Sequence, residues 1–123
     1  MEINLNCDLG EKSKFCSTEN DPKLLRIVNT ANIACGYHAG DEDTMRNTIR
    51  IAKKNGVSIG AHPSFNDKEN FGRKRIYLKN HEIEKLVTEQ LEIISKIADE
   101  EKYPITHVKP HGALNNMACE DYE

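Results

Sequence analysis

The sequence predicts an α/β fold with parallel strands, and three features of the 123-residue chain indicate it. Strand-like and helix-like segments alternate in the order β-α-β-α-β-α-β, which implies right-handed crossovers between parallel strands. The strands share one polar face and one apolar face. Ionisable residues gather where the strands end. We therefore expect a single domain, residues 1–123, with a site at the carboxyl edge of its sheet.

The first half of the chain supplies two strands and two helices. Residues 3–8 alternate apolar and polar side chains as a strand does, and an Asp-Pro pair then begins a short amphipathic helix over residues 21–28. Residues 31–35 predict the second strand. Asp41 predicts the N-cap of the next helix, which Gly56 ends.

The second half repeats the alternation with longer elements. Residues 57–62 predict a third strand, and residues 63–79 form a long polar loop of the kind that often carries function. Residues 80–98 show apolar side chains at helical spacing, with Asn80 as the expected N-cap. Residues 105–109 predict the fourth strand.

The composition is that of an ordinary soluble protein. Charged residues make up 30% of the chain and the formal net charge is −3, which gives no electrostatic case for nucleic acid. No apolar run is long enough to span a membrane, and the acidic N-terminus does not resemble a secretory signal. We expect a cytoplasmic protein with four reduced, buried cysteines, Cys7, Cys16, Cys35 and Cys119.

Counting by parity places polar or small residues on one shared face of the strands. They are Asn4, Asn6, Asp8, Asn32, Ala34, Gly36, His38, Ser58, Gly60, His62, His107, Lys109 and His111. This pattern fits the inside of a barrel that carries a site, and Ile105 is its one exception. The alternative is a two-layer sheet with one solvated face. That alternative does not explain why an aspartate and three histidines fall at strand ends beside Gly or Pro.

The residues at the strand ends indicate the chemistry. One carboxylate and three imidazoles converge there, from Asp8, His38, His62 and His111. Such a set suits a divalent metal such as Zn²⁺, or a general acid/base pair acting on a polarised carbonyl. No local spacing such as HExxH selects the metal, so both alternatives stay open. Lys109 would supply a cation for an anionic substrate or an oxyanion, and Arg73 could bind a carboxylate or phosphate.

Five segments carry a resemblance to a known family. They are NCDLGE (6–11), ANIACGYHAGD (31–41), GAHPSFND (60–67), FGR (71–73) and HVKPHGAL (107–114). In this order they resemble the LamB/YcsF family of 5-oxoprolinase A subunits. The resemblance implies an irregular (β/α) barrel of the glycoside hydrolase/deacetylase type. It also implies ATP-dependent ring opening of 5-oxoproline to glutamate, performed together with subunits B and C.

The strand-end pattern and the family motifs together give expected roles for single residues. Catalysis is expected of Asp8, His38, His62, Lys109 and His111. Substrate binding is expected of Glu11, Asn32, Asp41 and Arg73. A divalent metal would take Asp8, His38, His62 and His111. The chain has no Walker-type glycine loop, so ATP is expected to act through the complex with the partner subunits.

Length is the main departure from the family. Members resemble a complete barrel of roughly 250 residues, whereas this chain stops at Glu123, just inside the helix expected after the fourth strand. We expect the N-terminal half of such a barrel, with four strands, as a fragment, a truncated gene product or a short homologue. Its open sheet edges and uncovered apolar helix faces predict that the chain self-associates.

Three functional hypotheses follow. The first is an amidohydrolase component acting on the lactam of 5-oxoproline. The second is a metal-dependent deacetylase or carbohydrate hydrolase, since a fold does not fix a function, and retention of Zn²⁺ through dialysis would favour it. The third is an inactive half-barrel that serves as a binding or assembly element.

Overall fold

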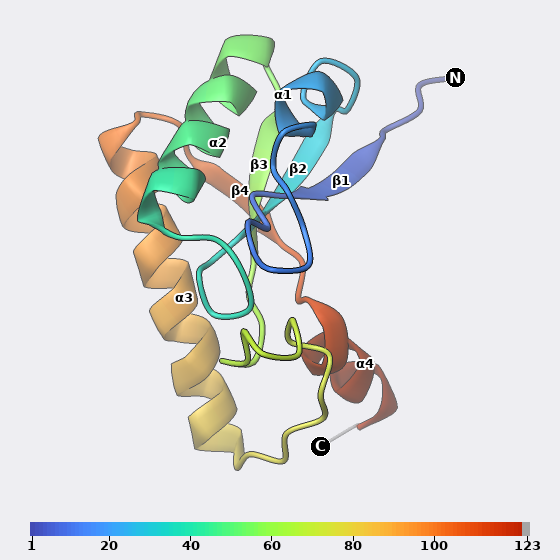
Figure 1. Ribbon diagram of the computed structural model, residues 1–123, viewed down its shortest axis with the longest axis vertical. Helices are drawn as coiled ribbons and strands as arrows, with labels where there is room; N and C mark the ends of the chain where they lie inside the picture. The colour runs from blue at the N-terminus through green and yellow to red at the C-terminus, as the bar shows by residue number, and fades with distance from the viewer. Residues whose placement is uncertain (122–123) are drawn as a thin grey trace.

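The computed structural model describes residues 1–121, and its four strands form one parallel sheet in the order β1-β2-β3-β4. The strands are β1 (Asn6–Leu9), β2 (Thr30–Ala34), β3 (Ser58–His62) and β4 (Ile105–Val108). The helices are α1 (Asp21–Leu24), α2 (Glu42–Asn55), α3 (Asn80–Glu100) and α4 (Gly112–Glu120). The α/β order predicted from the sequence is confirmed, and the sheet is open, as expected of part of a barrel (Figure 1).

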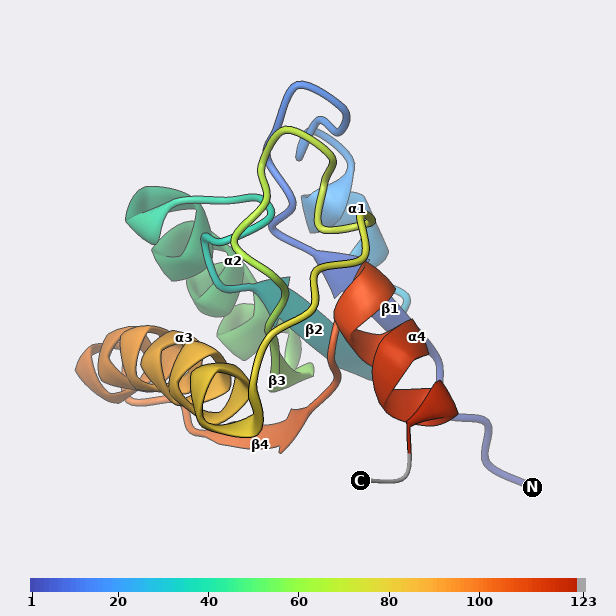
Figure 2. The same ribbon diagram turned by 90° about the horizontal axis from the view of Figure 1, so that it is seen from below.

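Helices α2 and α3 cover one face of the sheet, whereas α4 lies apart from them beyond the end of β4 (Figures 1 and 2). The main apolar core fills the space between the sheet and these two helices. Its buried members include Ala31, Ile33, Cys35, Met45, Ile49, Ala52, Ile59, Ala61, Ile94, Ile97 and Ala98. The apolar outer face predicted for β2 and β3 is therefore confirmed, and the opposite face is left for polar side chains.

Local sequence signals set both ends of α2. Asp41 is the N-cap, and its Oδ1 accepts hydrogen bonds from the backbone nitrogen of Thr44 at 2.8 Å and from Thr44 Oγ1 at 2.6 Å. At the other end Gly56 takes a left-handed conformation with φ of 67°, which glycine adopts without a Cβ clash. Both boundaries agree with the sequence prediction.

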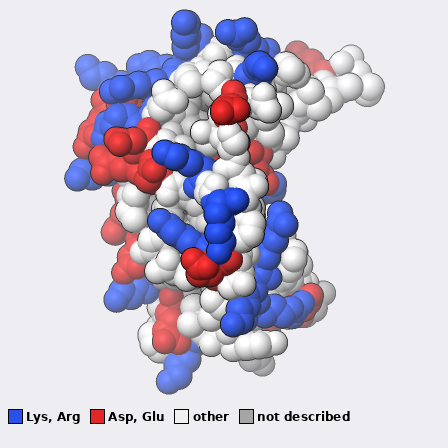
Figure 3. All heavy atoms as spheres, viewed as in Figure 1, with Lys and Arg blue, Asp and Glu red and all other residues white. Residues whose placement is uncertain are grey.

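Arg46 on α2 connects this helix to the end of α3. Its guanidinium lies 2.6 Å from a carboxylate oxygen of Glu100 and 2.9 Å from one of Glu101. Acidic and basic side chains intermingle over this side of the molecule (Figure 3). Arg46 and Glu101 are half-buried, so these ion pairs connect α2 to the end of α3 at a partly covered site.

The first strand and first helix are shorter than predicted. Because β2 begins at Thr30, opposite Asn6, the residues before Asn6 have no strand to pair with. Ile3 is accordingly 68% exposed instead of forming part of an apolar face. Helix α1 ends at Leu24, and Ile27 is 65% exposed.

Three further predictions are corrected. The N-cap of α3 is Lys79 and not Asn80, and the backbone nitrogen of Lys79 donates to the Glu82 carboxylate at 2.7 Å. Of the four free cysteines only Cys35 is buried, and Cys119 is exposed on the short helix α4. The predicted final helix ends at Glu120, and Glu123 lies outside the described residues. None of the helices in residues 1–121 is both long and apolar enough to cross a membrane.

A bulge in β4 explains the one exception in the polar face. Ile59 pairs with Ile105, but Gly60 pairs with His107, so that Thr106 is an extra residue between them. The extra residue shifts the alternation of side chains. Ile105 therefore packs against the apolar core, and His107 joins the polar face. Simple parity placed Ile105 on the inner face, and that assignment is wrong.

Candidate functional site

A row of hydrogen-bonded polar side chains crosses the inner face of the sheet. Asn32 on β2 is fully buried, and its Nδ2 donates to Asn6 Oδ1 at 2.7 Å and to Asp8 Oδ1 at 2.9 Å. On the other side, Nε2 of His107 donates to Asn32 Oδ1 at 2.8 Å. Gly60 makes room for that ring, because a Cβ there would clash with His107 Nε2. Asn32 thus connects side chains of β1 with a side chain of β4 across the inner face of the sheet.

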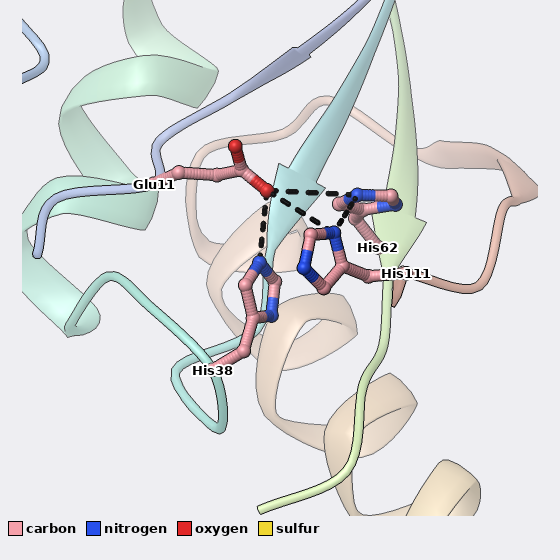
Figure 4. Close-up of side chains that lie close together, drawn as sticks. All are labelled: Glu11, His38, His62 and His111. Carbon is pink, nitrogen blue, oxygen red and sulfur yellow. Dashed lines mark hydrogen bonds and ion pairs between the residues drawn. The ribbon is translucent and has the colours of Figure 1, made fainter. Parts of the chain in front are cut away.

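Beyond the strand ends, a glutamate and three histidines come together (Figure 4). The ligand atoms of Glu11, His38, His62 and His111 all lie within 4.8 Å of one another. Glu11 Oε1 is 2.9 Å from His38 Nε2, 3.6 Å from His62 Nε2 and 3.5 Å from His111 Nδ1. The four residues follow β1, β2, β3 and β4 respectively or end them, so parallel pairing brings them to one edge.

Backbone hydrogen bonds continue the pairing of β3 and β4 past the strand ends. The nitrogen of Lys109 donates to the carbonyl of Ala61 at 2.9 Å, and that of His111 donates to Pro63 at 2.8 Å. These bonds hold His62 and His111 side by side. As a result, His62 Nε2 and His111 Nδ1 are 3.0 Å apart.

A main-chain carbonyl holds the outer nitrogen of each of these two rings. His62 Nδ1 donates to the carbonyl of Lys109, and His111 Nε2 donates to the carbonyl of Phe71 at 2.8 Å. Because a carbonyl oxygen only accepts, these outer nitrogens carry the protons. In the neutral rings the inward nitrogens are therefore bare lone pairs, and they face each other across the cluster.

Residues 71–73 close over the cluster. The buried Phe71 ring lies edge-on to the rings of His38 and His111, with centroids 5.2 and 5.0 Å away. Phe71 and Gly72 are both left-handed, with φ of 55° and 63°. A phenylalanine in this region is uncommon, and backbone strain of this kind clusters at functional sites.

Burial controls the charge of the cluster. It lowers the pKa of both His38 and His62 to about 4, so these rings are neutral at ordinary pH. Burial likewise lowers the pKa of His111 and raises that of Glu11. Neutral imidazole is the form that accepts a proton or binds a metal ion.

An ion pair lies beside the histidines. Lys109 Nζ is 2.8 and 3.0 Å from the two carboxylate oxygens of Asp8, and Asp8 Oδ2 is 3.4 Å from His62 Nε2. Burial acts to raise the pKa of Asp8. Hydrogen bonds from Lys109 and Asn32 and the nearby His62 outweigh burial, so the pKa of Asp8 is lowered and the carboxylate is ionised.

The two remaining predicted residues lie in different places. Arg73 is exposed, and its guanidinium carbon lies 5.2 Å from the centroid of the Phe71 ring. It helps to line a pocket of about 530 Å³ formed by Phe15, Cys16, Glu69, Asn70, Phe71 and Arg73. Asp41 caps α2 with its carboxylate and is not one of the four clustered residues.

The structure changes the grouping of possible metal ligands. The sequence groups Asp8 with the three histidines, but Glu11 is the carboxylate that the structure places among them. Gly10 turns the chain just after β1, and the side chain that follows reaches inward. Asp8 is instead engaged by Lys109. Three imidazoles and one carboxylate are a donor set that suits Zn²⁺.

Sequence reasoning missed a buried glutamine, Gln90 on α3. Its Oε1 accepts from the backbone nitrogen of Ser64 at 2.9 Å, and its Nε2 donates to the Ser64 carbonyl at 2.8 Å. These two bonds fix the start of the loop that later passes over the histidines. A signal was present, because Gln90 is a polar residue within the apolar stripe of α3, between Val87 and Ile94.

Comparisons with known proteins find close relatives. A model of the LamB/YcsF family matches residues 3–123. Proteins described as the A subunit of 5-oxoprolinase, from Azoarcus sp. and Nitrobacter hamburgensis, are 50% and 48% identical over 100% and 98% of this chain. The crystal structure of the lactam utilization protein from Thermus thermophilus superposes with a TM-score of 0.91, at 39% identity over 97% of the chain. The chain spans about half the length of these proteins, 48% in each case.

Proposed function

Because the chain belongs to the LamB/YcsF family, we propose that it provides the catalytic centre of an ATP-dependent 5-oxoprolinase that opens 5-oxoproline to glutamate. The observation that carries this proposal is the buried cluster of Glu11 and three histidines beside the Asp8–Lys109 ion pair. The names of the relatives, which refer to 5-oxoprolinase and to lactam utilization, support the choice of a lactam substrate. Subunits B and C are the proposed partners, and ATP acts through the assembled complex.

Hydrolysis of a lactam needs a base, a site for the oxyanion and an acid. Water attacks the carbonyl carbon, and the inward lone pair of His62 or His111 takes its proton. The carbonyl oxygen becomes negatively charged, and the ammonium group of Lys109 stabilises it. The ring C–N bond then breaks, and the imidazolium returns its proton to the leaving nitrogen.

Asp8 contacts both the ammonium group that stabilises the oxyanion and one of the two candidate bases. Its two oxygens hold the Lys109 ammonium group, and its Oδ2 lies 3.4 Å from His62 Nε2. An ionised carboxylate in this position stabilises the imidazolium that forms when His62 accepts a proton. We therefore place Asp8 as a positioning and charge-stabilising residue, not as the base.

The direct test is glutamate release from 5-oxoproline in a reconstituted system. The chain is mixed with subunits B and C and ATP, and each component is left out in turn. In a parallel set of mixtures, the Azoarcus relative takes the place of this chain. We expect glutamate only from the complete mixtures. Glutamate formation by B and C alone would contradict the proposal, and activity with the relative but not with this chain would favour a binding or assembly role instead.

We expect Arg73→Ala to raise the KM for 5-oxoproline about tenfold or more while changing kcat less. Arg73 lines the pocket next to Phe71, and a guanidinium–carboxylate contact made equally in the ground and transition states affects KM. Lys74→Ala is the matched control, since Lys74 is the next residue and is also exposed. An unchanged KM in Arg73→Ala would show that this side chain does not hold the substrate carboxylate.

A further inference from the structure

We propose that the clustered side chains form a binding site for a divalent transition metal, with Zn²⁺ as the expected occupant. The ligands are Glu11, His38, His62 and His111. The proposal extends the site assigned above and rests on the proposed function only for the role of the ion in turnover. Binding itself is inferred from the arrangement of the ligand atoms.

Two acceptor atoms, one each from His62 and His111, meet at the centre of the cluster without a donor between them, and Glu11 Oε1 lies beside them. His62 Nε2 and His111 Nδ1 are lone pairs 3.0 Å apart, because their outer nitrogens donate to carbonyls. Glu11 Oε1 lies 3.6 and 3.5 Å from these two atoms. Three acceptors facing one another repel unless positive charge lies among them. A proton would join only one pair of them, whereas a metal ion joins all three.

The spacing of these atoms is close to that of a tetrahedral ion. Bonds of ~2.0–2.1 Å to nitrogen and oxygen place the ligand atoms of tetrahedral Zn²⁺ roughly 3.4 Å apart. In the cluster, Glu11 Oε1 is 2.9, 3.6 and 3.5 Å from the three imidazoles. All the ligand atoms lie within 4.8 Å of one another, so small side-chain movements would complete the coordination.

The surroundings hold the ligands in place. The carbonyls of Lys109 and Phe71 orient the rings of His62 and His111, which is the outer contact that metal-binding histidines usually make. His38 is 0% exposed and His62 is 1% exposed. The ligands are therefore largely preorganised by strand ends and by the loop that carries Phe71.

The donor types select the kind of ion. Ca²⁺ and Mg²⁺ take mainly oxygen ligands, whereas three imidazoles and one carboxylate favour Zn²⁺ or a neighbouring transition metal. With Zn²⁺ bound, the inward nitrogens of His62 and His111 would be ligands and not bases. A water bound as a further ligand would then take over their part, because Zn²⁺ lowers the pKa of a coordinated water. Retention of Zn²⁺ therefore no longer separates a lactam hydrolase from a deacetylase, and the substrate assay must do so.

Metal binding can be measured directly on the chain. The protein is stripped with a chelator and titrated with Zn²⁺ against a coloured competitor, and Co²⁺ is used as a spectroscopic probe. We expect about one ion per chain and the intense visible absorption of tetrahedral Co²⁺. Glu11→Gln and His62→Ala are expected to weaken Zn²⁺ binding by about tenfold or more. Glu11→Gln keeps the shape of the side chain and guards against a folding defect.

Matched controls come from α3, where His81→Ala and Glu92→Gln alter exposed residues of the same types. Both controls should bind Zn²⁺ as the wild type does. No uptake of Zn²⁺, or equal binding by Glu11→Gln and Glu92→Gln, would overturn the site. Because this readout uses no 5-oxoproline, it is independent of the glutamate assay. If the chain binds Zn²⁺ but the complete mixture yields no glutamate, the metal site is supported and the proposed function is contradicted.

Discussion

Replacing His62 with alanine is expected to lower glutamate formation by the reconstituted enzyme about a hundredfold or more. The ring of His62 lies at the centre of the site, with Nε2 3.0 Å from His111 Nδ1, 3.4 Å from Asp8 Oδ2 and 3.6 Å from Glu11 Oε1. Alanine removes an inward lone pair that is available as a base or as a metal ligand. It also deprives the Lys109 carbonyl of its donor.

His81→Ala is the control for this substitution. His81 is exposed in the first turn of α3, so its removal changes the histidine content without touching the site. Circular dichroism and thermal unfolding of both variants separate a chemical defect from a folding defect. Turnover of a folded His62→Ala protein within about twofold of the wild-type rate would assign His62 a structural role only.

Gly72→Ala is expected to destabilise the fold by about 3 kcal/mol. The left-handed backbone at Gly72, with φ of 63°, disfavours any residue that has a Cβ. That Cβ would also clash with Ser64 Oγ and lie 3.0 Å from the Cβ of His38, both in buried residues. The free energy of unfolding, measured by denaturant titration, should fall, and catalysis should fall with it as the loop moves off the histidines.

Gly56→Ala separates these two effects. Gly56 has nearly the same backbone, with φ of 67°, but a Cβ there would meet nothing within 4 Å. This variant is expected to lose only the conformational part, about 1–2 kcal/mol. The difference between the two variants measures the steric cost of a Cβ that is packed against Ser64 and His38. Equal losses of stability would contradict close packing at Gly72.

The parts of the fold that the sequence predicted well depend on neighbours in the chain. Asp41 and Gly56 begin and end α2 through contacts with residues of the adjoining helical turn. The three histidines were found because parallel strands bring their carboxyl ends to one edge, whatever the details of packing. Alternation within β2 and β3 likewise identified which side chains enter the core.

The features that the sequence did not reveal depend on contacts between distant segments. Ile3 alternates correctly for a strand, but it lacks a partner because β2 begins only at Thr30. The Thr106 bulge is set by pairing with β3 and leaves no local mark. Glu11 enters the cluster through the turn at Gly10, which a count of alternating residues in β1 does not reach.

The polar row through Asn32 bears on how the sheet assembles. A slip of β2 by one residue would turn this buried amide into the apolar layer beneath α2 and leave it without partners. It would also strip Asp8 and His107 of the amide that joins them. Any slip by an odd number of residues is penalised in this way, so the polar side chains of the inner face help to fix the register of the strands.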